Sequence, residues 1–114
     1  MRFDLHYYQT SGGERPFVEW LQGLRDRQAR SRIEARLARV VVGNPGDARS
    51  VGEGVLELRI DLGPGYRVYF SRAGKVIVLL LCAGDKRTQQ RDIERAKAYF
   101  EDYKSRTARK ARGA

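Results

Sequence analysis

The sequence has very few of the residues that most enzymes use for metal binding or nucleophilic chemistry. Its 114 residues include one cysteine, Cys82, and one histidine, His6. A single cysteine excludes a disulfide within the chain and suits a reducing compartment. These two soft ligands stand alone, and no Ser/His/Asp arrangement or phosphate-binding loop is present. We therefore predict that the protein uses no metal and no cofactor.

Long hydrophobic runs are also missing. The longest lies between Val76 and Ala83, far short of the roughly 20 apolar residues that a membrane-spanning helix needs. The first residues lack the apolar core of a signal peptide. From these absences we expect a soluble, cytoplasmic protein that has no membrane partner.

Negative charge is scarce relative to positive charge. The chain carries 23 Lys and Arg against 14 Asp and Glu, which gives a formal net charge of +9. Such a field favours a polyanionic partner, with nucleic acid first and an anionic membrane surface or an acidic protein as alternatives. A hydrophobic content of 41% in a chain of this length predicts one domain with one core.

What the sequence does contain is a clear hairpin pattern between Glu57 and Phe70. Apolar and polar residues alternate on both sides of a Gly63-Pro64-Gly65 turn, as expected of strands that bury one face. Cross-strand neighbours lie roughly 5 Å apart, so the polar face forms a compact constellation. The predicted pairs are Leu62 with Tyr66, Ile60 with Val68, Leu58 with Phe70, Asp61 with Arg67, and Arg59 with Tyr69.

The remaining elements follow from periodicity and from turn residues. We predict a strand over residues 3–8, a helix opened by Pro16, a second helix from about Asp26, a loop over 47–54, and a central buried strand over 75–82. Asp85 or Thr88 caps a last helix. The predicted class is α+β: a small antiparallel sheet in the order β-α-α-β-β-β-α, with helices against one face and an N-terminal α-hairpin among them. Residues 1–103 form the domain, and 104–114 form a basic, flexible tail.

Cations and aromatics carry the candidate chemistry. Arg59 and Arg67 can hold a phosphate through paired hydrogen bonds, and Tyr66 or Tyr69 can stack on a base. Lys86 and Arg87 follow the buried strand and can bend back over the sheet. Cations around a scissile phosphate stabilise the charge that develops there, and RNA supplies its own 2′-hydroxyl as nucleophile.

Purely structural interpretations remain open for the same residues. Asp61 and Arg67 can form a cross-strand ion pair worth only about 0.2–1 kcal/mol at the surface. Arg59 over Tyr69 can be an ordinary cation–π contact. The basic face of the second helix, which includes Arg36 and Arg39, is either a solvated face or a contact surface for acidic protein or ribosomal RNA.

Three segments together resemble the RelE/ParE toxin superfamily. They read E-L-R-I-D-L-G-P-G-Y-R-V-Y-F, then V-I-V-L-L-L-C-A-G-D-K-R-T-Q-Q-R-D-I-E-R-A, and near the N-terminus R-P-F-V-E-W-L. The chain looks closest to the HigB-like branch of type II toxin–antitoxin systems, known as phage-derived addiction module killer proteins. The resemblance extends from about Phe3 to Tyr103.

This resemblance implies a RelE-like fold and a ribosome-dependent mRNA endonuclease that inhibits translation. It assigns catalytic roles to Arg67, Arg59, Lys86 and Arg87, with Arg67 of the Gly-Tyr-Arg motif on the scissile phosphate. The residues expected to bind RNA are Tyr66, Tyr69, Arg36 and Arg39. Two positions depart from RelE itself: Glu57 replaces a second lysine, and Ile93 replaces a catalytic tyrosine.

The partners that the resemblance implies are the ribosome, mRNA and a cognate antitoxin, commonly an acidic helix-turn-helix protein. The superfamily also contains gyrase poisons and inactive members. The alternatives are therefore a ParE-like DNA gyrase inhibitor and a decayed toxin that only binds its antitoxin.

Overall fold

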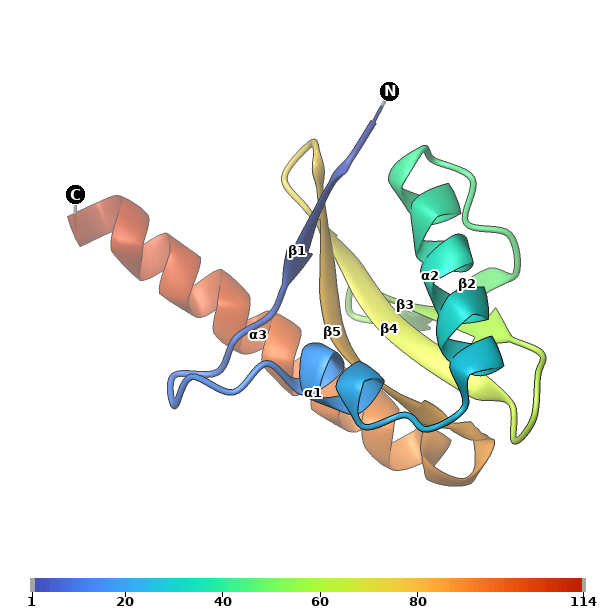
Figure 1. Cartoon of the computed structure of the whole chain (residues 1–114). Helices are drawn as coiled ribbons and strands as arrows, with labels where there is room; N and C mark the ends of the chain where they lie inside the picture. The colour runs from blue at the N-terminus through green and yellow to red at the C-terminus, as the bar shows by residue number, and fades with distance from the viewer. Residues whose placement is uncertain (1, 114) are drawn as a thin grey trace.

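The structure, a computed structural model, describes residues 2–113 as five strands, three α-helices and one short 3-10 turn (Figure 1). The elements in chain order are β1 (Asp4–Tyr7), α1 (Pro16–Gln22), α2 (Arg27–Val41), β2 (Ala48–Gly52), β3 (Val55–Ile60), β4 (Tyr66–Ala73), β5 (Ile77–Asp85), η1 (Lys86–Thr88) and α3 (Gln89–Gly113).

All five strands belong to one sheet in the order β1-β5-β4-β3-β2. β1 pairs with β5 in parallel, and the other three pairings are antiparallel. The α+β class and the mostly antiparallel sheet are therefore confirmed. β2 was not predicted, because its short and largely polar sequence, Ala-Arg-Ser-Val-Gly, lies on an edge of the sheet and shows no buried alternation.

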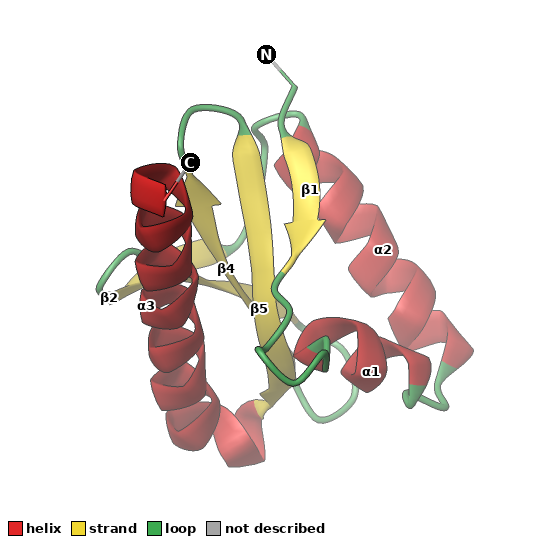
Figure 2. Cartoon of the chain, turned by 90° about the vertical axis from the view of Figure 1, so that its left-hand side faces the viewer, coloured by secondary structure: helices red, strands yellow, loops and turns green. Residues whose placement is uncertain are grey.

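Helices cover both faces of the sheet rather than one. Figure 2 shows α1 and α2 on one side of the strands and α3 on the other. Ile33 of α2 and Phe17 of α1 belong to the first core, whereas Ala96 and Phe100 of α3 belong to the second. The expectation of helices against a single face was wrong. The run from Val78 to Leu81 in β5 points apolar side chains alternately to both faces, so each face needs a cover.

The hairpin of β3 and β4 has the predicted faces but a different register. Ile60 pairs with Tyr66 and Leu58 with Val68, so the loop covers residues 61–65 instead of 63–65. Gly63 and Gly65 adopt positive φ angles of 56° and 80° in this loop. Because the register differs by an even number of residues, every side chain keeps its predicted face. Arg59 now lies opposite Arg67 instead of Tyr69.

α3 continues to Gly113, so residues 104–113 are helical where a flexible tail was predicted. Ala, Arg and Lys are good helix formers. Arg106 also ties the helix to the end of β1: its Nη2 donates to the Gln9 carbonyl. At the other end, Asp85 caps the short η1 turn that leads into α3, since its carboxylate accepts from the Arg87 backbone N–H at 2.8 Å. Despite its length, α3 is too polar to cross a bilayer, and no other helix in residues 2–113 qualifies.

The turn between β2 and β3 limits how closely α3 can pack. Gly54 has a φ of +80°, and a Cβ built there would lie 2.9 Å from Phe100 Cε2. Gly74 has a φ of +63° with open space around it. We expect Gly54→Ala to lower the free energy of unfolding by about 2–4 kcal/mol, since backbone strain and overpacking add. Gly74→Ala should lose about 1 kcal/mol from backbone strain alone. Equal losses in urea denaturation would contradict this packing.

Candidate functional site

A buried carboxylate lies at the junction of β2, β3, β4 and α3. The side chain of Glu57 in β3 is completely buried. Its Oε1 accepts hydrogen bonds from Arg49 Nε at 3.2 Å and from Arg59 Nε at 3.1 Å. Its Oε2 accepts from the Tyr69 hydroxyl at 3.0 Å and from Gln89 Nε2 at 2.8 Å. We call these five residues the Glu57 cluster.

The hydrogen bonds decide the protonation states within the Glu57 cluster. Burial by itself raises the pKa of Glu57. Donation from Gln89, Arg59, Tyr69 and Arg49 more than offsets this, so the pKa lies below the ordinary value of a glutamate. Burial, and then the neighbouring Glu57 charge, raise the pKa of Tyr69 far above its ordinary range. At neutral pH the cluster therefore contains a carboxylate and a neutral phenol that donates to it.

The next row of the sheet brings two arginines together. Arg59 of β3 lies opposite Arg67 of β4, which in turn lies opposite Gly84 of β5. Both arginine side chains extend from the Glu57 face, because residues two apart on a strand share a face. Gly84 leaves room for the helix that follows: a Cβ there would clash with the Asp92 carboxylate and the Thr88 hydroxyl. The start of α3 therefore packs directly over β5. The two guanidinium groups lie at the edge of this contact between helix and strand.

Arg67 has hydrogen-bonding capacity that its own chain does not use. The residue is only 7% exposed. Its Nη1 donates to the Tyr66 carbonyl at 3.1 Å, and its buried Nε has no partner within residues 2–113. A buried cationic donor without an acceptor is costly, so Arg67 is a position whose retention calls for a functional or structural reason.

Lys86 and Arg67 both lie against Gly65. A Cβ on Gly65 would lie 3.5 Å from Arg67 Nη1 and 3.6 Å from both Cβ and Cδ of Lys86. Arg87, the neighbour of Lys86, instead pairs with Asp85, at 3.1 Å between Nη2 and Oδ2. The bonds that Arg87 donates also hold the pKa of Asp85 below its ordinary value. Of the two predicted residues after β5, Lys86 is therefore the one beside the paired arginines.

The two tyrosines predicted to stack on bases are buried in the structure. Tyr69 is fully buried beneath α3 within the Glu57 cluster. Tyr66 points to the other face of the sheet, where its ring makes an edge contact with Trp20 at a centroid distance of 5.9 Å. Neither ring presents a face to a base, because helices cover both sides of the sheet. Asp61 is exposed and forms no ion pair with Arg67.

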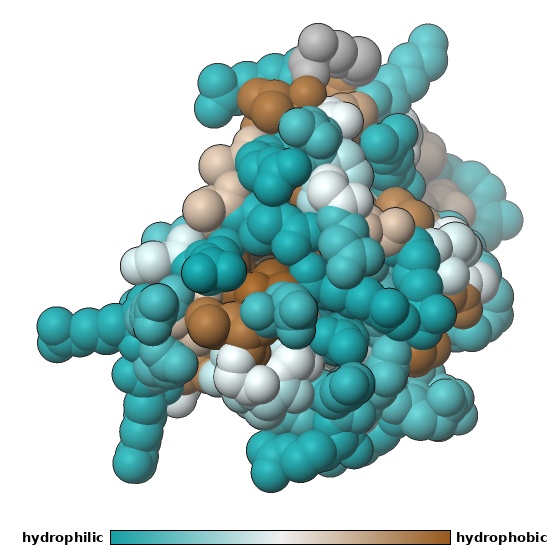
Figure 3. Space-filling model, turned by 90° about the vertical axis from the view of Figure 1, so that its right-hand side faces the viewer, coloured by the Kyte–Doolittle hydropathy of each residue, from teal (hydrophilic) through white to brown (hydrophobic). Residues whose placement is uncertain are grey.

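Arg36 and Arg39 of α2 have different surroundings. Arg36 Nη1 donates to the Arg59 carbonyl at 2.6 Å, and its Nη2 donates to the Pro45 carbonyl at 2.8 Å. Burial, followed by the Arg39 charge, lowers the pKa of Arg36. Arg36 thus braces the end of β3, whereas Arg39 is exposed. Figure 3 shows the side of the molecule that carries α2 and β2, where hydrophilic residues cover most of the surface.

Sequence reasoning missed the central residue of this site. Glu57 was noted only as a departure from a lysine, and its partners Arg49 and Gln89 were not singled out. The sequence predicted a loop at Arg49. Gln89 lies beyond the η1 turn, and no pattern linked it to the hairpin. The alternation did place Glu57, Arg59 and Tyr69 on one face, and this was the available signal.

The side chains of this site are mainly cationic. No group of three or more His, Cys, Asp or Glu in residues 2–113 can hold a metal ion. Arg67, Lys86 and Arg59 supply three cationic groups at one end of the sheet, and guanidinium groups bind phosphate in a fixed geometry. The ionised Glu57 keeps Arg59 in place.

Removing the Glu57 charge should destabilise the protein in a pH-dependent way. We expect Glu57→Gln to lower the free energy of unfolding by about 3 kcal/mol at neutral pH, because the buried group loses its charge and an amide NH₂ replaces one of the two oxygens that accept hydrogen bonds. The folded pKa lies below the ordinary one. The contribution is therefore full above the ordinary glutamate pKa and is lost as the pH falls through the folded pKa.

Urea titrations over a range of acidic pH values test this expectation. The gap between wild type and Glu57→Gln should shrink on acidification, and Glu94→Gln on the exposed side of α3 should have little effect at any pH. A gap that stays constant or widens as the pH falls would be inconsistent with a buried, ionised Glu57.

Comparison with known proteins gives one informative relative. No protein-family model matches the chain. A protein of Haemophilus influenzae (strain Rd), described as an uncharacterized protein, is 51% identical over 81 residues. The match covers 71% of this chain and 82% of the Haemophilus protein. The chain therefore belongs to the same protein family as this Haemophilus influenzae relative.

Proposed function

We propose that the protein is the toxin of a type II toxin–antitoxin module, in the HigB-like branch of the RelE/ParE superfamily. It acts as a ribosome-dependent mRNA endonuclease that inhibits translation. The observation that carries this proposal is the buried Arg67 guanidinium. Its Nε has no partner in the described chain, and it lies beside Lys86 and opposite Arg59.

The reaction that this site suits is RNA cleavage by the substrate's own 2′-hydroxyl. The 2′-oxygen forms a bond to phosphorus and the bond from phosphorus to the 5′-oxygen breaks, which yields a 2′,3′-cyclic phosphate and a 5′-hydroxyl. Water takes the proton from the 2′-hydroxyl and returns one to the leaving oxygen. Arg67 and Lys86 bind the phosphate oxygens, and their charge stabilises the phosphorane as it forms.

Arg59 and Glu57 have different roles in this scheme. Arg59 is one-third exposed, so its guanidinium can reach both the Glu57 carboxylate and a bound phosphate. Glu57 is a positioning residue and not a general base, because four donors already occupy its oxygens and its side chain is fully buried. Its negative charge also offsets part of the repulsion between the closely spaced cations.

The overall arrangement supports the same assignment. α1 and α2 follow each other directly and share one core with the sheet, as an N-terminal α-hairpin of a RelE-like fold would. The net charge of +9 suits an acidic partner and a ribosomal RNA surface. We therefore propose an acidic helix-turn-helix antitoxin as the cognate partner, and a cytoplasmic location beside the ribosome.

Induced expression followed by mapping of new mRNA ends tests this function. Wild type should stop protein synthesis rapidly and produce cuts at fixed codon positions. Arg67→Ala should reduce cleavage by about a hundredfold or more, since it removes the main phosphate ligand. Arg67→Lys, which keeps the charge but loses the planar fork, should recover only part of the activity. Arg72→Ala serves as the control, because Arg72 lies at the opposite end of β4 over Phe3.

Other outcomes would assign a different function to the protein. Full toxicity and unchanged cuts in a folded Arg67→Ala variant would refute the catalytic assignment. Intact mRNA together with gyrase-linked DNA breaks would identify a ParE-like inhibitor. A wild-type protein with no effect on growth would be a toxin that only binds its antitoxin.

A further inference from the structure

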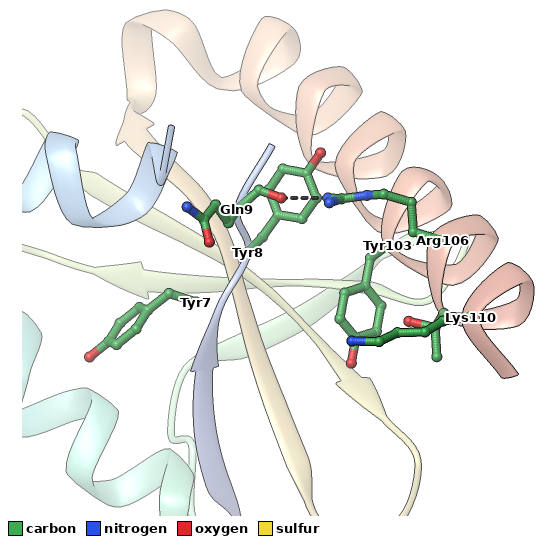
Figure 4. A pocket seen from close by; sticks show the side chains of 7 residues that line it. Tyr7, Tyr8, Gln9, Tyr103, Arg106 and Lys110 are labelled. Carbon is green, nitrogen blue, oxygen red and sulfur yellow. Dashed lines mark hydrogen bonds between the residues drawn. The ribbon is translucent and has the colours of Figure 1, made fainter. Parts of the chain in front are cut away.

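A pocket lies far from the Glu57 cluster, between the end of β1 and the C-terminal half of α3. It has a volume of about 260 Å³, and its lining includes Tyr8, Gln9, Tyr103, Arg106 and Lys110. Figure 4 shows Tyr103, Arg106 and Lys110 extending from the helix toward this space. Seventeen residues separate Gln89, which contacts Glu57, from Arg106 on the same helix. At 1.5 Å per residue the two sites are therefore about 25 Å apart.

Hydrogen bonds fix the wall of this pocket before any ligand binds. Arg106 Nε donates to Asp102 Oδ2 at 2.9 Å, and Arg106 Nη2 donates to the Gln9 carbonyl, the bond dashed in Figure 4. The Tyr8 hydroxyl donates to the same Asp102 oxygen at 2.7 Å. Asp102 is thus engaged within the protein, and a rigid wall costs less entropy to bind against than a mobile one.

The aromatic residues differ in what they can offer a ligand. Tyr8 is buried between the Tyr99 ring, at 4.7 Å between centroids, and the Arg106 guanidinium, at 5.6 Å from its ring. Burial and the Asp102 contact raise the pKa of Tyr8 to about 12, so it remains a neutral donor. Tyr103 is only partly buried, and it lines the same pocket as Lys110. Tyr7 also lines the pocket, but its ring stacks with Phe17 at 6.1 Å between centroids, so Tyr103 is the ring that we assign to stacking.

The charge around the pocket is positive. From Lys104 to Gly113 the helix has five cationic residues and no acidic one: Lys104, Arg106, Arg109, Lys110 and Arg112. Arg106 is paired with Asp102 and Lys104 with Glu101, whereas Lys110 forms no ion pair within residues 2–113. A partly exposed ring together with such a cation is the combination with which proteins bind single-stranded nucleic acid. The volume lies at the small end for ligand pockets and suits one base with its phosphate better than a larger molecule.

We propose that this pocket is a second RNA contact, in which Tyr103 stacks on an unpaired base and Lys110 binds the adjacent phosphate. This inference rests on the proposed function for its choice of RNA as the polyanion. It adds a contact about 25 Å from the cleaving end, on a helix face that the cleavage chemistry does not use. A long single strand can then bind at both ends of α3.

Fluorescence anisotropy tests the pocket without any cleavage. The probe is a labelled single-stranded oligouridine with 2′-fluoro groups, which cannot be cut through a 2′-hydroxyl. Tyr103→Leu should weaken binding about tenfold, since it removes one stacked base. Lys110→Gln should reduce the slope of log affinity against log salt by about 0.7, the value for one lost phosphate contact. Arg109→Gln, the neighbour of Lys110 on another side of α3, is the matched control and should change affinity by less than about twofold.

Each result separates the pocket from its alternatives. Equal losses in Lys110→Gln and Arg109→Gln, with none in Tyr103→Leu, would mean diffuse attraction and would overturn the proposal. Competition by polyglutamate as strong as by RNA of equal charge would indicate an acidic protein partner and would also overturn it. The proposed cleavage is judged separately from mRNA ends in cells. Loss of cleavage in Arg67→Ala with unchanged oligouridine binding would leave the pocket assignment standing.

Discussion

The interaction on which the rest of the structure depends is the contact between the Glu57 carboxylate and its four donors. A buried carboxylate without partners costs several kcal/mol, so its burial requires that every donor be in place. Those donors come from β2, β3, β4 and the first residue of α3. The edge strand, the hairpin and the last helix must therefore assemble together. The same contact holds the Arg59 side chain, which the β3–β4 register places opposite Arg67.

The two hydrophobic cores explain why the cationic side chains of the site lie at the edge of the sheet. α1 and α2 cover one face and α3 covers the other, so the strand interiors are closed to solvent on both sides. Near the start of β4 and the start of η1, the sheet holds Arg59, Arg67 and Lys86 on rigid backbone. Arg67 is the most buried of the three, since it is 7% exposed, and its Nε has no partner in the described chain. Sheet positions of this kind hold a ligand more firmly than a loop does.

The sequence predicted the elements better than it predicted their contacts. Alternation placed Leu58 and Arg59 on the correct faces, but it could not fix the register, because a shift by two residues leaves the pattern unchanged. β2 was missed because a polar edge strand has no period to detect. The burial of Tyr66 depends on Trp20, and the role of Glu57 depends on Gln89. Both partners are distant in the chain, and no local pattern reveals them. The contact of Arg106 with the Gln9 carbonyl, which accompanies the helical continuation beyond Lys104, is likewise between residues distant in the chain.

The most direct test of this account is the ionisation of Glu57 in the folded protein. The carboxyl carbon of Glu57 can be followed by NMR through an acid titration, with Glu57→Gln used to assign the signal. The account predicts a midpoint below the ordinary glutamate value of about 4.3, because the donors more than offset burial. A midpoint at or above that value would mean that burial dominates. The carboxylate would then not be the charged centre that positions Arg59, and the proposed arrangement of cations would lose its basis.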